Sequence, residues 1–394
     1  MLEKIDNYLE NLDLDIRKSR NARFMDQKVT PDVLCIISDC ILKYLEIKED
    51  DNIEFTSKDI WDFEYSNTNI KQIFTKADVF NVKAKNEYDK FFQQPLKALS
   101  YANILKEEKR GTRIYFSVKS IEILRFISIK ERNALDFLNI YLEKVLKDSD
   151  LWDLFNTFFE RNTKENFNKL KIFYENFIIE HTPINGKTEV RRIFTKVLNP
   201  LSFKRQKHGT NKGFFSKDII SNNELMYNRK NWRDIKKKKT ETRREYEIRA
   251  REEIEYSKSA YIKYTVNKAI NIVRKLHSPN SEVTDELAVG EATQVHHIFM
   301  KSEFPQIESY IENLILLTAT QHSTKAHPGN NTRLIDKDYQ LICLLAKSQS
   351  IESNKNIYSK EDFLYVLKIG LNQDLSLDTS FDEIKQKLIE IYHS

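Results

Sequence analysis

Four of the eight histidines of this chain lie close together in the sequence, at His296, His297, His322 and His327. A neutral imidazole has a pKa near 6.5, so it can take a proton from water at physiological pH, and it can also bind a divalent cation. Cleavage of a phosphodiester bond needs both, because water must lose a proton while the phosphate and the leaving oxygen gain negative charge. The stretch is therefore a candidate centre for metal-assisted hydrolysis.

The elements around these histidines must place them on different sides of one site. Apolar residues beside His296 and His297 predict one strand, and the Leu/Ile run after Asn313 predicts a second. Adjacent residues of a strand point to opposite faces, so we expect one of the two histidines to face a metal and the other the attacking water. Asn313 can orient the base through a hydrogen bond across the hairpin. A short helix opening near Thr320 would carry His322 as a second metal ligand.

At these positions the chain resembles the HNH endonucleases, the ββα-metal nuclease family. In that family a His/Asp-His pair is followed by an Asn about fifteen residues later and by a His or Asn nine residues beyond. Here His297 to Asn313 is sixteen residues and Asn313 to His322 is nine. The resemblance covers about residues 288–332. It implies that His297 is the general base, that Asn313 positions it, and that His296 and His322 bind the metal.

Two features depart from the family pattern. His327 follows His322 by five residues, whereas four is the spacing in the subgroup with a further helical histidine. It can therefore ligate the metal, contact phosphate or do neither. The paired zinc-knuckle cysteines of some family members have no counterpart, because the three cysteines are Cys35, Cys40 and Cys343. The surrounding helices must then hold the small hairpin-helix motif.

We expect one divalent metal ion per active site. Imidazole suits Zn²⁺, Ni²⁺ or Mn²⁺ better than Mg²⁺, which prefers oxygen ligands. Two histidines together with phosphate oxygens and waters can still hold Mg²⁺. We therefore expect Mg²⁺ in vivo, with Mn²⁺, Ni²⁺ and Zn²⁺ as alternatives.

The positive charge of the chain is concentrated in one segment. The net charge is +5, but Lys187 to Arg251 carries 20 Lys and Arg against 7 Asp and Glu. A solvated helix face can carry such charge too. Aromatic residues and two of the seven glycines also lie here, however, and a third, Gly186, directly precedes the segment; glycine lets a backbone approach a phosphate closely. We therefore expect this segment to grip DNA, with the candidate contacts Lys204, Arg205, Lys207, Lys212, Arg229, Lys230 and Arg233.

Nearer the N-terminus, the sequence predicts three helices followed by a basic hairpin. The helices are expected at about 31–44, 55–61 and 86–101, and the hairpin within 103–117. This order resembles a winged helix-turn-helix module, although an ordinary helical bundle with a hairpin is the alternative. In the winged interpretation the third helix enters the major groove and the hairpin is the wing. The candidate contacts are Gln93, Gln94 and Lys97 on the helix and Lys109, Arg110 and Arg113 on the hairpin.

The predicted fold class is mainly α with small β elements, because seven glycines and seven prolines are too few for an all-β sandwich. Residues 1–23 read as one amphipathic helix, and Pro200, Gly209 and Gly213 predict a loop-rich start to the basic segment. The expected organisation is a winged-helix-like module at 1–125, a helical connector at 126–185, a basic DNA-gripping segment and helix at 186–285, and an HNH nuclease domain with C-terminal helices at 286–394.

Taken together, these resemblances imply a sequence-specific type II restriction endonuclease that cuts double-stranded DNA to 5′-phosphate and 3′-hydroxyl ends. The alternatives are a non-specific or nicking HNH nuclease of toxin or repair type, and a non-catalytic winged-helix DNA-binding protein with a structural metal. One site cuts one strand, so a double-strand break implies a homodimer or sequential nicking. A restriction system adds a cognate DNA methyltransferase as a partner.

The sequence also predicts where such a protein works. It has no apolar stretch of about 18 residues that could span a membrane. The N-terminus has no basic and apolar signal region, and the cysteines do not form a disulfide framework. We therefore expect a bacterial cytoplasmic location and no membrane partner.

Overall fold

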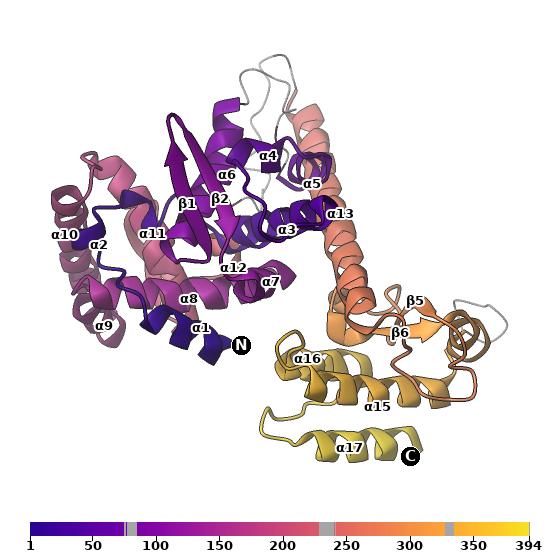
Figure 1. The fold of residues 1–394 in the computed structure, drawn as a ribbon. Helices are drawn as coiled ribbons and strands as arrows, with labels where there is room; N and C mark the ends of the chain where they lie inside the picture. Colours follow the sequence, from indigo (N-terminus) through magenta and orange to yellow (C-terminus); the bar gives the residue numbers. More distant parts are fainter. Residues whose placement is uncertain (75, 77–84, 228–239, 241, 328–334, 394) are drawn as a thin grey trace. The chain divides into compact units, whose positions relative to one another are not determined.

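The computed structural model describes the whole chain except residues 75, 77–84, 228–239, 241, 328–334 and 394 (Figure 1). The described chain is mainly helical and contains three two-stranded antiparallel sheets, which confirms the predicted mainly-α class with small β elements. It divides into two compact units, Met1–Ser257 and Lys258–Ser394. The four-part organisation expected from the sequence stays a prediction. None of the described helices is long and apolar enough to cross a membrane.

The predicted single helix over residues 1–23 is wrong, because the chain breaks there into three short helices. Asp13 and Asp15 accept hydrogen bonds from nearby backbone N–H groups, and Arg20 ends the second helix in the left-handed conformation. Such local side-chain bonds compete with a continuous helix. The pieces are α1 (Leu2–Glu10), α2 (Ile16–Ser19) and η1 (Ala22–Phe24).

The three helices expected next are confirmed, and the structure adds a fourth. Pro31 begins the first of them, where its fixed φ and lack of an N–H suit the first turn. Thr56 forms a capping box with Asp59 at the second. The added helix was not evident from the sequence because its apolar residues are sparse. The four are α3 (Pro31–Lys48), α4 (Ser57–Trp61), α5 (Glu64–Phe74) and α6 (Lys85–Tyr101).

The expected hairpin is confirmed as β1 (Leu105–Arg110) paired with β2 (Arg113–Val118). Gly111 lies in its turn with a φ of +61°, a conformation that glycine adopts without strain. Phe55, just before α4, exchanges two backbone hydrogen bonds of 2.9 and 2.7 Å with Phe116 of β2. The hairpin is thus tied to the start of α4. The winged-helix assignment stays a prediction.

Four helices follow between Ile121 and His181, but the loop-rich start predicted for the basic segment is wrong. Pro200 lies inside a helix, α11 (Lys187–Lys204), and the two glycines lie in or beside a hairpin. The Asn199 side chain bonds both backbone groups of Thr210, at 2.9 and 3.0 Å, which fixes this hairpin to α11. A Cβ at Gly209 would lie 2.6 Å from Asn199, so glycine is needed for this close approach. The remaining elements are α7 (Ile121–Ile129), α8 (Glu131–Asp148), α9 (Trp152–Glu160), α10 (Lys164–His181), β3 (His208–Asn211), β4 (Phe214–Ile219) and α12 (Asn222–Leu225).

The long helix α13 (Arg243–His277) contains the division between the two units. After it, the second unit holds the two expected strands, β5 (Ala292–His297) and β6 (Leu314–Thr318), in an antiparallel pair that sets His296 opposite Ile315. Every residue of β6 is buried, whereas β5 is partly exposed. The elements that follow are α14 (Ala319–Gln321), the π-helical turn η4 (His322–Ala326), α15 (Lys337–Ser353), α16 (Lys360–Leu371) and α17 (Phe381–His393).

Candidate metal centre

Three imidazoles meet at one point of the second unit. His296 comes from β5, and His322 and His327 lie at the start of η4 and just after its end. The atoms that could bind a metal all lie within 4.8 Å of one another, and the ring centroids are 4.8 to 5.4 Å apart. His296 and His327 are only 5% and 8% exposed. This cluster can hold a metal ion.

The π-helical turn explains how His327 reaches the cluster in spite of its unusual spacing. In an α-helix, residues five apart differ by about 140° around the axis, because one turn takes 3.6 residues. A π-helix closes each turn with a bond five residues long. The His327 N–H donates that bond to the His322 carbonyl, at 3.0 Å. The wider turn therefore brings both rings to the side on which His296 lies.

The donor set fits a divalent cation. Burial, together with the smaller effect of the neighbouring histidines, lowers the pKa of His296 to about 3. Burial also lowers the pKa of His322. These two imidazoles are therefore neutral at pH 7, the form that binds a cation. Three nitrogen donors are typical of sites for Zn²⁺ or Ni²⁺ rather than Mg²⁺.

His297 lies outside this cluster, as expected for the neighbouring residue of a strand. Its Nε2 is 3.0 Å from the carbonyl oxygen of Glu308, in the loop between the two strands. A carbonyl oxygen only accepts, so Nε2 carries the proton and Nδ1 keeps the lone pair. Burial lowers the pKa of His297, and the Glu308 carbonyl opposes that shift by favouring the charged ring. The Glu308 carbonyl thus fixes His297 as a neutral imidazole, with Nδ1 as its basic nitrogen.

Asn313 acts on the loop rather than on the histidine, so the expected direct hydrogen bond to His297 is wrong. Its fully buried amide accepts from the Phe299 N–H at 2.9 Å and donates to the carbonyls of Phe299 and Ile307 at 3.0 and 3.3 Å. These bonds close the loop that carries Glu308. Asn313 therefore positions His297 through the backbone of that loop.

We expect Asn313→Ala to lower the free energy of unfolding by about 3 kcal/mol. The substitution leaves the buried backbone groups of Phe299 unpaired, at roughly 1–3 kcal/mol for each unsatisfied group. Urea unfolding of the full chain measures the loss. Asn354→Ala is the matched control, because Asn354 makes one side-chain bond to the Ser350 carbonyl. Equal stabilities of the two variants would contradict the role given to Asn313.

A buried ion pair links the hairpin to helix α15. Lys347 of α15 and Glu282 are both fully buried, with Nζ and Oε2 2.6 Å apart. Glu282 also pairs with β6, because its Oε1 accepts from the Leu316 N–H and its N–H donates to the Leu316 carbonyl, at 2.8 and 2.9 Å. Lys347 donates to the Tyr358 hydroxyl as well. Helix α15 thereby stabilises the hairpin, as expected for a motif without zinc-knuckle cysteines.

Breaking this ion pair should be strongly destabilising. We expect Lys347→Met to cost about 3–5 kcal/mol, since it leaves the Glu282 carboxylate buried without its cation. Adding Glu282→Gln should recover part of the loss, because it removes the unpaired charge. Thermal or urea unfolding measures both variants. Lys368→Met breaks an exposed pair with Asp374 and should cost less than about 1 kcal/mol; a similar loss in both lysine variants would refute the assignment.

The sequence-predicted contacts on α6 are partly used inside the protein. The Gln94 side chain accepts from the Lys28 N–H at 2.9 Å. Lys97 is paired with Glu107 at 2.8 Å, and both side chains are largely covered. Gln93 is half-buried. Their role as DNA contacts stays a prediction, but two of the three already support the fold.

The basic candidates on the hairpins differ from one another. Arg110 binds both carboxylate oxygens of Glu54, at 2.7 and 2.8 Å. Arg205 is paired with Glu143 at 2.9 Å and lies over the rings of Trp152 and Phe159. The others are exposed or half-buried, or fall outside the described residues. Lys109, Arg113, Lys204 and Lys212 are exposed and Lys207 is half-buried, whereas Arg229, Lys230 and Arg233 lie outside the described part of the chain.

Sequence reasoning missed the Glu308 carbonyl and the Glu282–Lys347 pair. A backbone carbonyl has no residue type to mark it, and a buried ion pair between distant residues follows no periodic pattern. Comparison with protein-family models, curated proteins and solved structures gives no match for this chain. The geometry of the centre is therefore the basis on which a function is argued.

Proposed function

We propose that this chain is an HNH-type endodeoxyribonuclease that cuts double-stranded DNA at specific sequences, as a type II restriction endonuclease does. One observation carries the proposal. Three imidazoles that can share a metal ion stand beside a fourth imidazole, held in place by a carbonyl, on the next residue of the same strand. A purely structural metal site does not require the fourth group, whereas hydrolysis requires a base beside the metal.

The chain's own residues supply the steps of hydrolysis. His297 keeps its Nε2 proton on the Glu308 carbonyl, so Nδ1 accepts a proton from the attacking water. The water oxygen bonds to phosphorus as the bond to the 3′-oxygen breaks, which yields a 5′-phosphate and, after protonation by solvent, a 3′-hydroxyl. His296, His322 and His327 would hold the divalent ion. When bound, that ion supplies positive charge to the phosphate and the leaving oxygen.

DNA is the substrate that the charge distribution favours. The segment from Lys187 to Arg251 carries an excess of 13 positive charges, whereas the rest of the chain carries a net negative charge. Lysine and arginine clusters of this kind supply the sequence-independent part of DNA affinity. Exposed Lys109, Arg113 and Lys212 on the two hairpins extend that contact. The winged-helix interpretation of the N-terminal elements belongs to this proposal.

The proposal also includes partners and a location. One centre per chain cuts one strand, so cleavage of both strands uses a homodimer or two successive nicks. A bacterial restriction enzyme of this kind works in the cytoplasm beside a cognate DNA methyltransferase. The donor set favours Ni²⁺ or Zn²⁺, and Mg²⁺ or Mn²⁺ would rely more on phosphate and water oxygens.

Plasmid cleavage tests the proposed function. The purified chain is freed of metal with a chelator, supplied with Mg²⁺, Mn²⁺, Ni²⁺ or Zn²⁺ in turn, and incubated with supercoiled plasmid. We expect discrete fragments whose sequenced ends share a recognition site. A smear or nicked circles alone would instead indicate a non-specific or nicking nuclease. DNA binding without scission under every ion would indicate a binding protein with a structural metal.

A further inference from the structure

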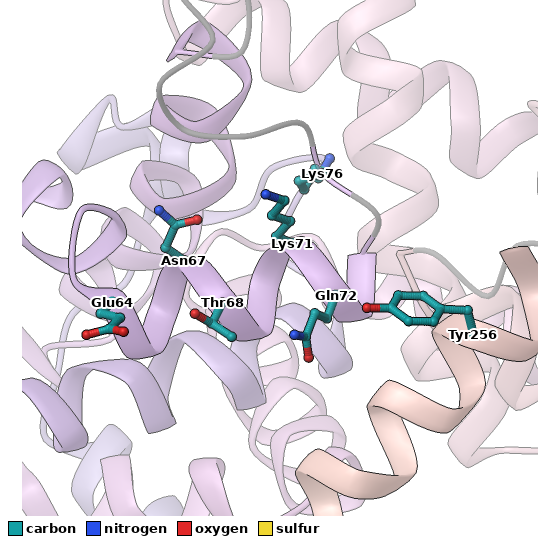
Figure 2. A pocket seen from close by; sticks show the side chains of 7 residues that line it. All are labelled: Glu64, Asn67, Thr68, Lys71, Gln72, Lys76 and Tyr256. Atoms are coloured by element: carbon teal, nitrogen blue, oxygen red, sulfur yellow. The ribbon is translucent and has the colours of Figure 1, made fainter.

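Helix α5 has one face in the core and one face open. Ile70, Ile73 and Phe74 are at most 7% exposed and fix the helix against its neighbours. The opposite face borders a hollow of about 620 Å³. Figure 2 shows the side chains of this face in two adjacent rows. The lining residues are Glu64, Asn67, Thr68, Lys71 and Gln72 of α5, with Lys76 and Tyr256 beside them.

The open face carries the side-chain types that read base edges. Asn67 and Gln72 can each bond an adenine through two atoms, Lys71 suits guanine, and Thr68 suits either. Each α5 residue that lines the hollow ends in a hydrogen-bonding group. Helical spacing of three and four residues places these groups on one side of a rigid helix. Such a row can match consecutive base pairs.

The charge and the space beside the helix favour duplex DNA as the occupant. Two lysines and one glutamate line the hollow, so its lining has a net positive charge. The major groove is about 12 Å wide and admits one α-helix. Lys71 and Tyr256 are suited to phosphate contacts there, whereas Lys76 donates to the Tyr227 hydroxyl at 2.8 Å.

Helix α6, the other candidate for the major groove, presents fewer free side chains to DNA. Its Gln94 and Lys97 bond to other parts of the same unit, whereas Thr68 and Gln72 of α5 are exposed. We propose that α5 enters the major groove and determines which sequence is bound, in place of α6, the helix to which the winged-helix interpretation gives that role. This inference rests on the proposed function, because it names the specificity-determining helix of the proposed nuclease.

Selection from a random pool of duplex DNA tests the inference. The full chain with His297→Ala serves as the parent, so that bound DNA is not cut, and the bound sequences are read. Asn67→Ala and Gln72→Ala are then added separately. Alanine is the best helix former, so α5 keeps its structure. Asn156→Ala, at an exposed position of α9, is the matched control.

We expect the parent to select a defined sequence and each α5 variant to lose preference at one or two base pairs. The discrimination at those pairs should fall by about 5- to 150-fold, the range for a bidentate base contact. Affinity for unrelated DNA should change by less than about twofold, because phosphate contacts remain. The Asn156→Ala control should select the parental sequence.

Three other outcomes separate this inference from the proposed function. If the parent selects a sequence and both α5 variants select the same one, α5 does not determine the specificity. The inference is then wrong, while the proposed function stands. Loss of preference in Gln93→Ala, with unchanged α5 variants, would give the role to α6. If the parent selects no sequence, the proposed specificity and this inference both fall.

Discussion

Replacing His296 with alanine is expected to remove the divalent metal from the chain and to abolish DNA cleavage. His296 is the ring that comes from β5, and the other two rings come from the π-helical segment on the other side of the cluster. Its loss leaves His322 and His327 as the two remaining nitrogen donors of the cluster. Even residues that only orient a metal ligand typically change affinity or activity by about 10–100-fold, so removal of a ligand should exceed about 100-fold in metal affinity.

Metal content after exhaustive dialysis and titration of the apoprotein measure this effect directly, without an activity assay. His393→Ala is the matched control, because His393 is an exposed histidine of the same unit, bonded to its own helix. We expect the control to retain the metal. His327→Ala should weaken binding as well, since the π-helical turn places that ring in the cluster. A His296→Ala chain that keeps its metal and still cuts DNA would overturn the proposed centre.

The sequence predicted the two strands of the centre well because their signals are local. The apolar residues beside His296 and the Leu/Ile run after Asn313 are short, buried patterns that the fold preserves. The spacing of His327 was ambiguous for a physical reason. Whether a turn closes over four or five residues depends on the packing of that turn, so residue types alone do not show that His322 and His327 share a face.

In the N-terminal unit, too, features set by nearby residues were predicted, and features set by contacts between distant segments were not. The start signals of two helices, Pro31 in the first turn of α3 and the Thr56–Asp59 capping box of α4, involve residues at most a few positions apart, and both helices were predicted. Helix α5 was not, because one of its faces is polar throughout. The assignment of Gln94 and Lys97 to a DNA-facing surface failed to anticipate their partners, Lys28 and Glu107, since those contacts form only when distant segments pack together.

His297→Ala should abolish cleavage by a different route, leaving the metal in place. The variant removes the nitrogen proposed to take the proton from water, and general-base catalysis contributes about 100- to 10,000-fold. His297 is bonded to the Glu308 carbonyl and is not one of the three clustered rings. We therefore expect the single-turnover cleavage rate to fall by that factor, while metal content and DNA affinity stay close to those of the unaltered chain.

This combination distinguishes a base from a ligand and from a structural residue. Gln306→Ala, which removes an exposed side chain from the loop between the strands, is the control and should cut at the original rate. Loss of metal in His297→Ala would make His297 part of the binding site instead. An unchanged rate would remove it from the mechanism. Because β5 places His296 and His297 on opposite faces, the two alanine variants should therefore fail differently: one without its metal, the other with its metal but without a base.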